Sequence, residues 1–536
     1  MADPTTMLWH DDRFAHGVRI DWPLKQQEGI IVELTEQQRD VVDHVVSGTN
    51  CTVSARAGTG KSSTIVAAVN QLAQARPGTS GYIVTYNAAP AREMQPQLPA
   101  KFQSRTMHSI AYQAIGNQFR ARLNPTNGTP VIAPWAAGEY MKLPELAVIT
   151  DAGKSTITGN AIATCVLRTI KRWCYTSDPV ITAGHTRLPH SIDKDQNPEL
   201  VELVVTTARR IWEEDCINPY PTGPRLAYDH EWYLKLWATT LFEENRWIGT
   251  DTLYIDEGQD SNQLVHALFT QQLALGVRGA VIGDPYQAIY GWRGARNIMG
   301  ALTKDGLPQL LLTQSWRFGQ AVADEGCKWL RLCGGEADLT GNPAITSNLG
   351  PIDPDRPYTV LCRTNAGCAT EVVSAVAAGH RTGIFGNLAQ VVPVLKAASH
   401  LKAGRRSEHP LLAAFPTWDQ FREYAESDEC DQQELTLTVR LLEGRNGWDV
   451  IRVLETAART KKPHVTVVTA HSVKGAQWPQ VKIGGDWKRP QPDPKTGQVI
   501  IPKETANLGY VAVTRAQHQL DVGDENTGLA WIDEHV

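Results

Sequence analysis

The stretch Ala55-Arg56-Ala57-Gly58-Thr59-Gly60-Lys61-Ser62 decides the fold that this sequence predicts. It follows a short apolar run, Thr52–Ser54, and leads into a helix-forming run, SSTIVAAVNQLAQA. Between a strand and a helix, the amides of a glycine-containing loop and of the helix amino terminus can surround a polyphosphate. Lys61 would then reach the β and γ phosphates, and the Ser62 hydroxyl would hold Mg²⁺. The strict P-loop pattern has glycine where Ala55 stands, so the strand–loop–helix setting carries part of this assignment.

A second GKS tripeptide occurs at Gly153-Lys154-Ser155. No strand is predicted before it, so we expect a turn there and no phosphate site.

A P-loop enzyme also needs carboxylates for the metal and the attacking water. The apolar run Leu253–Ile255 ends in Asp256 and Glu257. Asp256 can bind Mg²⁺ through its water shell, and Glu257 can accept a proton from the nucleophilic water. Adjacent acids after a strand are common on solvated loops, but beside a P-loop they predict an ATP-hydrolysing site.

Short apolar runs, each followed by a polar or glycine-containing loop, predict buried parallel strands with functional loops at their carboxyl ends. The runs are Thr52–Ser54, Tyr82–Thr85, Leu253–Ile255, Ala280–Ile282, Tyr358–Cys362, Val465–Thr469 and Val481–Ile483. They form two sets, each interrupted by a stretch with helical patches. We therefore predict an α/β protein with two domains built on parallel sheets, each carrying a mainly helical insertion. The expected boundaries are 1–112 and 240–305 for the first domain around an insertion at 113–239, and 306–390 and 463–536 for the second around a small insertion at 391–462.

Composition narrows the class of protein without fixing its partner. Hydrophobic residues make up 42% and charged residues 20%, and neither a membrane-spanning run nor a secretory signal is visible, so we expect a cytoplasmic or nucleoid-associated protein. The net charge of −5 argues against a broad basic face for nucleic acid, but a narrow positive channel needs only local charge. The nine cysteines contain no CxxC pair, which favours reduced thiols over a zinc or iron–sulfur site.

In order along the chain, several blocks resemble the motifs of superfamily 1 DNA helicases of the UvrD/Rep type, whose motor domains are RecA-like. Beside the P-loop, which resembles AGAGSGKT, these blocks are Leu34–Arg39 (the adenine-reading glutamine motif), Asp256–Asp260 (DEAQD), Gly283–Ala295 (GDxxQSIYxWRGA), Leu312–Arg317 (LxxNYRS), Thr469–Trp478 (TxHxxKGLEF) and Leu508–Ala516 (LxYVAxTRA). Within the family the chain is most similar to the F-box DNA helicase subgroup, although no F-box is recognisable. The features that suggest this subgroup are Thr106–Tyr112, Val360–Asn365 and the small second insertion.

The resemblance implies roles around ATP and Mg²⁺. Gln38 would read the adenine edge, Trp316 would stack on the base, and Gln287 would sense the γ-phosphate. Arg317 and Arg515 would meet that phosphate from the second domain, and an arginine finger of this kind changes the rate by about 10³–10⁵-fold. Three further positions would lie beside the nucleotide: Ser63, Gly475 and Gln477. Relatives carry arginine at the position of Ser63, and at the position of Gln477 they carry a glutamate thought to contact the ribose.

The resemblance also implies a path for single-stranded DNA. Hydroxyls and amides that contact phosphates and sugars, without reading sequence, would come from Thr85, Asn87, Thr106, His108, Thr469, His471 and Ser472. Trp292, with Tyr290 nearby, would stack on a base. The cluster Lys171-Arg172-Trp173 with Tyr175 could grip DNA or belong to a solvated helix. The run Trp232–Trp237 is expected to be a packed helix rather than a stacking platform.

The expected function is therefore an ATP-dependent 3′→5′ helicase or translocase in DNA replication, recombination or repair. Its partners would be single strands and single-strand/duplex junctions, with single-strand-binding or recombinase proteins as further candidates and no membrane. The alternatives are a translocase that strips recombinase or other proteins with little unwinding, a DNA-responsive signalling ATPase, and a helicase–nuclease subunit. For the last, the chain ends soon after the final motor block and leaves no room for a nuclease domain.

Overall fold

The computed structural model describes residues 34–123, 131–132, 136–150, 153–189, 191–220, 223–291, 297–386, 388–405, 407, 409, 412, 415, 417–426, 433–443, 447–493 and 496–534. The chain divides into two compact units. The first unit comprises residues 34–313 and 413–433, and the second comprises residues 314–412 and 434–536.

The first unit is built on a six-stranded sheet in the order β10-β1-β9-β8-β2-β3, in which every neighbouring pair is parallel. Its strands are β1 (Cys51–Ala55), β2 (Gly81–Val84), β3 (Phe102–Arg105), β8 (Thr252–Ile255), β9 (Arg278–Gly283) and β10 (Gln309–Leu312). Because the strands are parallel, all their carboxyl ends lie at one edge, where functional loops gather in sheets of this kind.

Helices cover both faces of this sheet, because its central strands are apolar on both sides. In β8, Leu253 and Ile255 pack in one core and Tyr254 in the other, as the two-residue period of a strand requires. One core is formed with α1 (Glu36–Ser47), α2 (Lys61–Ala75) and α3 (Ala88–Met94). The other is formed with α4 (Met107–Ala114), α9 (His230–Glu243), α10 (Gln263–Ala274) and α11 (Ile298–Lys304).

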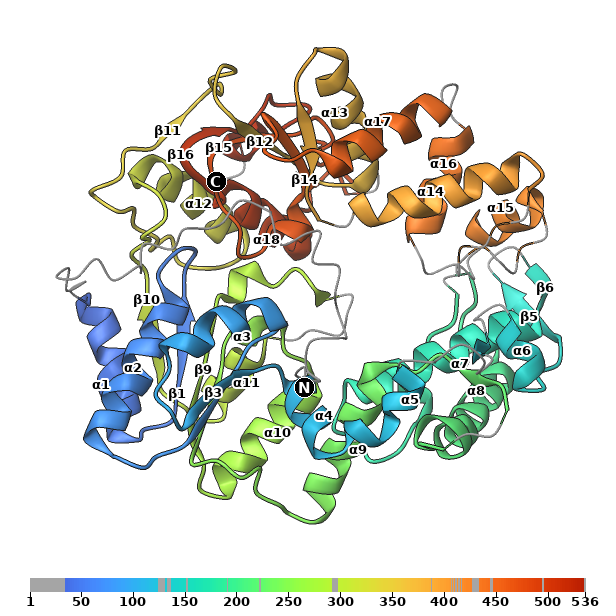
Figure 1. Cartoon of the computed structure of the whole chain (residues 1–536), viewed down its shortest axis with the longest axis horizontal. Coiled ribbons are helices and arrows are strands. Elements are labelled where there is room, and N and C mark those ends of the chain that lie inside the picture. Colours follow the sequence, from blue (N-terminus) through green and yellow to red (C-terminus); the bar gives the residue numbers. More distant parts are fainter. Residues whose placement is uncertain are drawn as a thin grey trace, which may run out of the picture. The chain divides into compact units, whose positions relative to one another are not determined.

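The insertion in the first unit has a hydrophobic core of its own. It contains α5 (Arg120–Leu123), α6 (Ala137–Tyr140), α7 (Gly159–Cys174) and α8 (Pro198–Ile211), drawn in cyan to green beside the sheet in Figure 1. It also contains the two-stranded sheets β4 (Val131–Ile132) with β7 (Arg225–Leu226) and β5 (Leu146–Thr150) with β6 (Gly153–Ile157). The turn predicted at Gly153-Lys154-Ser155 is wrong, because these residues pair in β6 antiparallel to β5. The first four residues of β6, Gly153 to Thr156, are exposed, and only Ile157 is buried. The sequence therefore has no apolar run that would predict this strand.

Helix α9 confirms the prediction of a packed helix for the run Trp232–Trp237. Trp232 is buried in the insertion core, whereas Tyr233 and Trp237 are buried in the core of the sheet domain. Lys235 is buried as well, and its Nζ donates to the carbonyls of Thr176 and Asp178, both at 2.8 Å. Burial lowers the pKa of this lysine to about 8. The expected boundary at residues 239/240 therefore falls inside a helix that belongs to both cores.

In the cluster that was considered for gripping DNA, Trp173 is buried in the insertion core and presents no exposed ring. Its neighbour Lys171 pairs with Asp229 at 3.1 Å.

The second unit is built on another all-parallel six-stranded sheet, in the order β11-β16-β15-β12-β14-β13. Its strands are β11 (Asn348–Leu349), β12 (Tyr358–Cys362), β13 (Thr382–Ile384), β14 (Val465–Thr469), β15 (Trp478–Ile483) and β16 (Ala516–Asp521). Its helices are α12 (Gln320–Leu332), α13 (Asn365–Ala377), α14 (Leu388–Lys402), α16 (Gln433–Glu443), α17 (Gly447–Arg459) and α18 (Lys503–Val513). The predicted fold class, two α/β domains with parallel sheets, is confirmed.

Two further boundaries differ from the expected ones. The second domain was expected to begin at residue 306, but β10 pairs with β1 through Val53–Leu310 and Ser54–Leu311, so the first unit extends to residue 313. Helix α15 (Trp418–Glu426) was expected in the second domain's insertion, yet it groups with the first unit. Tyr424 of this helix lines a hollow with Leu143 and Thr164 of the first insertion. Among the described helices, none is long and apolar enough to cross a bilayer.

The packing of α9 gives a stability test. Trp237 is 3% exposed and Trp247 is 50% exposed. Trp237→Ala should lower the free energy of unfolding by about 3–5 kcal/mol, because it leaves a large cavity. Trp247→Ala, the matched control, should cost about 1 kcal/mol, mainly the hydrogen bond from its indole to the Thr250 carbonyl. Urea unfolding of both variants measures the difference, and equal costs would contradict the assignment of Trp237 to the core.

Candidate functional site

The P-loop lies at the carboxyl edge of the first sheet. Strand β1 ends at Ala55, and α2 begins at Lys61. Between them, Gly58 and Gly60 have φ angles of 75° and 78°, a left-handed conformation that glycine adopts without strain. The amide of Arg56 donates to the carbonyl of Leu312 at 2.8 Å, which fixes the start of the loop on β10. The loop therefore has the backbone turn that a phosphate cradle at a helix amino terminus requires.

The two candidate metal ligands lie together beside this loop. The Ser62 hydroxyl donates to Asp256 Oδ2 at 2.9 Å, and Asp256 follows β8. Burial and the neighbouring Glu257 raise the pKa of Asp256 to about 6, while Lys61 and the bond from Ser62 pull it down. A buried carboxylate and a hydroxyl are the hard oxygen ligands that Mg²⁺ prefers, so this pair fits the predicted ion.

Glu257 is held in one position by a buried glutamine. It has a φ of 56°, unusual for a residue with a side chain, and its Oε2 accepts from Gln259 Nε2 at 2.6 Å. Gln259 Oε1 in turn accepts the amide of Asp284 at 3.0 Å. Gln259 is fully buried and joins the candidate base to the loop after β9. The sequence analysis quoted this glutamine within Asp256–Asp260 but gave it no role, although its position two residues after the candidate base was a signal.

The loop after β9 continues the same chain of hydrogen bonds. Gln287 is buried, and its Nε2 donates to Asp284 Oδ2 at 2.7 Å. Burial raises the pKa of Asp284, opposed by the positive charges of Lys61 and Arg56. Arg56 lies over the Tyr286 ring at 5.0 Å and donates to Ser54 Oγ at 3.1 Å. Together with Ser62, Asp256, Glu257 and Gln259, these groups connect the P-loop to the candidate γ-phosphate sensor.

The candidate adenine reader, Gln38, is buried and faces the P-loop. Its Nε2 donates to Thr64 Oγ1 at 3.1 Å, and its Oε1 accepts the amide of Thr35 at 3.1 Å. The Thr35 hydroxyl accepts the Gln38 amide in return, which completes a capping box at the start of α1. The structure thus engages both atoms of the Gln38 amide within the chain, and adenine recognition stays a prediction.

The candidate DNA contacts of the first unit follow the strands next to the nucleotide strands. In the sheet order, β1, β9 and β8 carry the phosphate and carboxylate residues, and β2 and β3 lie directly beside them. Thr85 follows β2, and its hydroxyl donates to the carbonyl of Asn87 at 2.7 Å. Thr106 follows β3 and caps α4 by accepting the amide of Ser109. One edge of the sheet therefore holds both groups of residues.

His108 has an acidic neighbour that the sequence analysis did not anticipate. Its Nε2 lies 3.3 Å from Glu231 Oε1 at the start of α9. Burial lowers the pKa of His108, but the Glu231 carboxylate outweighs this effect and raises it above the ordinary value. A histidine held in this way carries its positive charge more readily near neutral pH, which suits a phosphate contact.

An aromatic pair lies at the same edge. The rings of Tyr86 and Tyr290 stack with centroids 5.8 Å apart and planes 6° apart, and Tyr86 is exposed. The sequence analysis singled out Tyr290 and missed Tyr86, although Tyr86 stands between Thr85 and Asn87. Trp292, the predicted stacking residue, lies outside the described residues.

The second unit brings the two candidate arginine fingers together. Arg317 Nε donates to Gln477 Oε1 at 2.8 Å, and its Nη1 donates to the Thr514 carbonyl at 2.8 Å. Arg515 is fully buried, and its Nε donates to the Val511 carbonyl at 2.9 Å. Trp316, next to Arg317, is exposed, and its stacking on the base stays a prediction.

The remaining candidates of the second unit follow β14. The hydroxyls of Thr469 and Ser472 lie 3.0 Å apart. His471 stands between these two residues in the sequence, and burial lowers its pKa. Gly475 is exposed with a φ of 85°. Ser63, in the first unit, is half-buried in the first turn of α2.

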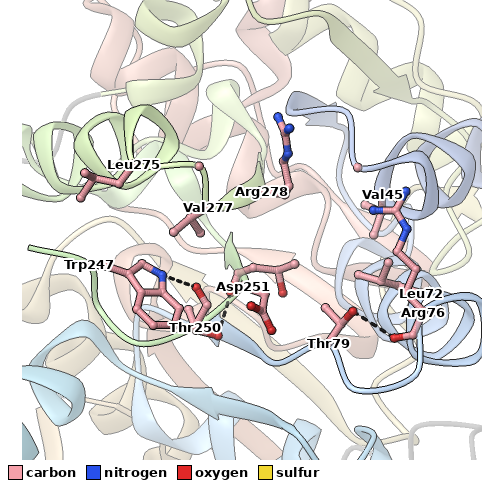
Figure 2. Close-up of a pocket in the computed structure, with 13 residues that line it drawn as sticks. Val45, Leu72, Arg76, Thr79, Trp247, Thr250, Asp251, Leu275, Val277 and Arg278 are labelled. Atoms are coloured by element: carbon pink, nitrogen blue, oxygen red, sulfur yellow. Dashed lines mark hydrogen bonds between the residues drawn. The ribbon is translucent and has the colours of Figure 1, made fainter.

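A cavity of about 650 Å³ opens at the other edge of the first sheet, where the strands begin (Figure 2). Trp247, Arg76 and Asp251 line it. Their polar atoms bond within the chain: the Trp247 indole donates to Thr250, Arg76 to the Ser47 carbonyl, and Ser80 to Asp251. This cavity is therefore separate from the P-loop and shares none of its residues.

The first unit has the strand, glycine loop and helix of a P-loop protein, and each of the two units is built on a parallel sheet. A family model described as an AAA domain matches residues 38–293. One relative is the F-box DNA helicase protein 1 of Schizosaccharomyces pombe, which is 25% identical over 92% of this chain and 58% of its own length. Another is the F-box DNA helicase 1 of Gallus gallus, which is 25% identical over 91% of this chain and 48% of its own length. The chain thus spans about half the length of these relatives. Together with the ordered motifs, these matches support the resemblance of the chain to superfamily 1 helicases of the UvrD/Rep type and to the F-box DNA helicase subgroup.

The bond between Gln259 and Asp284 depends on the absence of a side chain at Gly283. A Cβ atom there would lie 2.1 Å from Gln259 Oε1. Gly283→Ala should therefore destabilise the first unit by about 1–3 kcal/mol through overpacking. Gly291→Ala, where a Cβ meets nothing within 4 Å, should change stability by about 0.5 kcal/mol or less. Denaturant unfolding compares the two, and an unchanged stability of Gly283→Ala would show that Gln259 is not fixed as described.

Proposed function

We propose that this protein is an ATP-driven motor that moves 3′→5′ along single-stranded DNA and separates duplexes ahead of it. The observation that carries the proposal is the partly buried hydrogen-bond chain from Ser62 to Gln287 at the carboxyl edge of the first sheet. The candidate DNA contacts follow the neighbouring strands of that same sheet. ATP chemistry and strand contact thus meet on one rigid scaffold.

The first unit would bind and hydrolyse ATP. The P-loop amides and Lys61 would hold the phosphates, with Ser62 and Asp256 as ligands of Mg²⁺. The metal, when bound, would neutralise charge on the β and γ phosphates. Glu257, fixed by Gln259, would accept the proton of the attacking water. Gln287 would register the γ-phosphate through the loop that begins at Asp284.

Arg317 and Arg515 of the second unit would supply the positive charge that stabilises the transition state. A contribution of this kind is worth about 10³–10⁵-fold in rate. Trp316 would stack on the base, and Gln38 would bond its edge. Because the two arginines share Thr514, a displacement of one is expected to move the other.

DNA would be held by its backbone and by stacking, without sequence preference. Thr85, Asn87, Thr106 and His108 would contact phosphates from the first unit. The exposed Tyr86, stacked against Tyr290, would add a base contact of about 1–3 kcal/mol. Thr469, His471 and Ser472 would contact the strand from the second unit. Binding of ATP and release of its products would alternate the grip of the two units, which produces stepping.

DNA as the substrate is also supported by the comparisons, since both named relatives are F-box DNA helicases. The direction of movement rests on the resemblance of Gly283–Ala295 to the 3′→5′ branch of superfamily 1. In that branch a stacking aromatic follows the γ-phosphate sensor.

Two variants test the ATP site. Lys61→Ala should lower DNA-stimulated ATP turnover by at least about 10²-fold, because it removes a donor to the phosphates. Glu257→Gln should retain ATP binding and lose about 10²–10⁴-fold in hydrolysis, because an amide cannot take the proton. The matched control is Lys154→Ala, in the other GKS tripeptide, on an exposed strand. It should turn over ATP like the wild type. Turnover near the wild-type rate in Lys61→Ala or Glu257→Gln would refute the assigned site.

The direction is tested on forked DNA. Duplexes with a 3′ single-stranded tail should be unwound, and those with a 5′ tail should not, with Glu257→Gln as the inactive control. Strand displacement is followed by the loss of base pairing between labelled strands. Unwinding of 5′-tailed duplexes alone would contradict the proposed polarity. ATP hydrolysis that clears protein filaments from single strands without unwinding would favour the translocase alternative.

A further inference from the structure

Both candidate arginine fingers are anchored on the same two segments of the second unit. Arg317 bonds the Gln477 side chain and the Thr514 carbonyl, both at 2.8 Å. Arg515 donates to the carbonyl of Ala476 at 3.3 Å and to the hydroxyl of Thr514 at 3.2 Å. Residues 476–477 and residue 514 thus hold both guanidinium groups.

The side chain that holds Arg317 is an uncharged amide. A hydrogen bond between a guanidinium and a neutral oxygen lacks the Coulomb attraction of an ion pair, so it is weaker than the bond between a guanidinium and a carboxylate. A neutral acceptor also leaves the positive charge of the guanidinium uncompensated by that contact. A γ-phosphate, which carries formal negative charge, therefore binds Arg317 more strongly than Gln477 does.

We propose that Gln477 is a positioning residue for the ATPase reaction: it holds Arg317 through a neutral bond that orders the guanidinium and releases it to the γ-phosphate. The inference rests on the proposed function, since it requires Arg317 to act on ATP. It assigns Gln477 to the arginine, not to the nucleotide ribose that the glutamate of relatives is thought to meet. The neutrality of this residue is then the property that matters.

The first test replaces the amide by a carboxylate. Gln477→Glu keeps the size of the side chain and turns the contact into an ion pair, which retains Arg317. The kcat of single-strand-stimulated ATP hydrolysis should fall about 5- to 10-fold, because the added Coulomb attraction of the ion pair opposes the transfer of Arg317 to the phosphate. The KM for ATP should stay within about 2-fold, because the arginine acts on the transition state. The loss should shrink at high salt, which screens the ion pair.

Gln498→Glu is the matched control, because it makes the same change at an exposed position of the second unit. Its kcat and KM should equal those of the wild type. The thermal unfolding midpoint of Gln477→Glu should be no lower than that of the wild type. This separates the kinetic effect from misfolding.

The second test asks whether Gln477 acts through Arg317. When Arg317 is already replaced by alanine, Gln477→Glu should have no further effect on the residual kcat. The new carboxylate then has no Arg317 guanidinium to hold. A full, additive loss in that background, or a rise in KM with kcat unchanged, would overturn the proposal and favour direct contact with the nucleotide. An unchanged kcat in Gln477→Glu alone would also overturn it.

The proposed function can fail separately from this inference. A wild-type protein that shows no ATP hydrolysis with single-stranded DNA would refute the proposed motor before any variant is compared. A DNA-stimulated wild type with an unaffected Gln477→Glu variant would leave the motor standing and remove only the role of Gln477.

Discussion

The structure depends on the buried hydrogen bonds that Gln259 makes between Glu257 and the loop that begins at Asp284. Buried polar groups must be paired, because an unpaired one costs about 1–3 kcal/mol. Gln259 satisfies this requirement only because Gly283 leaves room for its oxygen. The candidate catalytic carboxylates and the Gln287 loop are consequently joined in one network. Movement of one part alone would leave a buried polar group without its hydrogen bond. In the proposed motor, this constraint would couple the state of ATP to the loop.

The sequence predicted seven strands that lie inside the sheets, which are β1, β2, β8, β9, β12, β14 and β15. It missed the edge strands β3, β10, β11 and β13, together with β16. Central strands such as β1 and β14 are buried on both faces, so their apolar runs are visible in the sequence. Strand β3 alternates buried and exposed residues at the sheet edge, and β16 is largely polar, so neither produces such a run. The boundary at residue 306 was misplaced for another reason. Strand β10 has the apolar run Leu310–Leu312, but its pairing with β1 in the first sheet joins segments that are distant in the sequence.

The candidate site was predictable where a local motif fixes both the backbone and the chemistry, as at Lys61 and Asp256. Contacts between distant segments were not predictable. No sequence pattern near His108 predicts its contact with Glu231, and none near Arg317 predicts its hydrogen bond to Gln477. Such pairs depend on which loops the fold brings together. The departure at Gln477 was visible in the sequence, but its contact to an arginine required the structure.

The proposed motor requires the first unit to combine an ATP site with contacts to single-stranded DNA. Its most direct measurement is the steady-state ATPase rate of the wild-type protein without DNA, with single-stranded DNA and with blunt duplex DNA. Single-stranded DNA of any sequence should strongly increase the ATPase rate, and blunt duplex DNA should increase it only slightly. The DNA concentration for half-stimulation should rise with salt, with a slope of about 0.7 per phosphate neutralised on logarithmic axes. An ATPase rate that does not respond to single-stranded DNA would contradict the proposed motor.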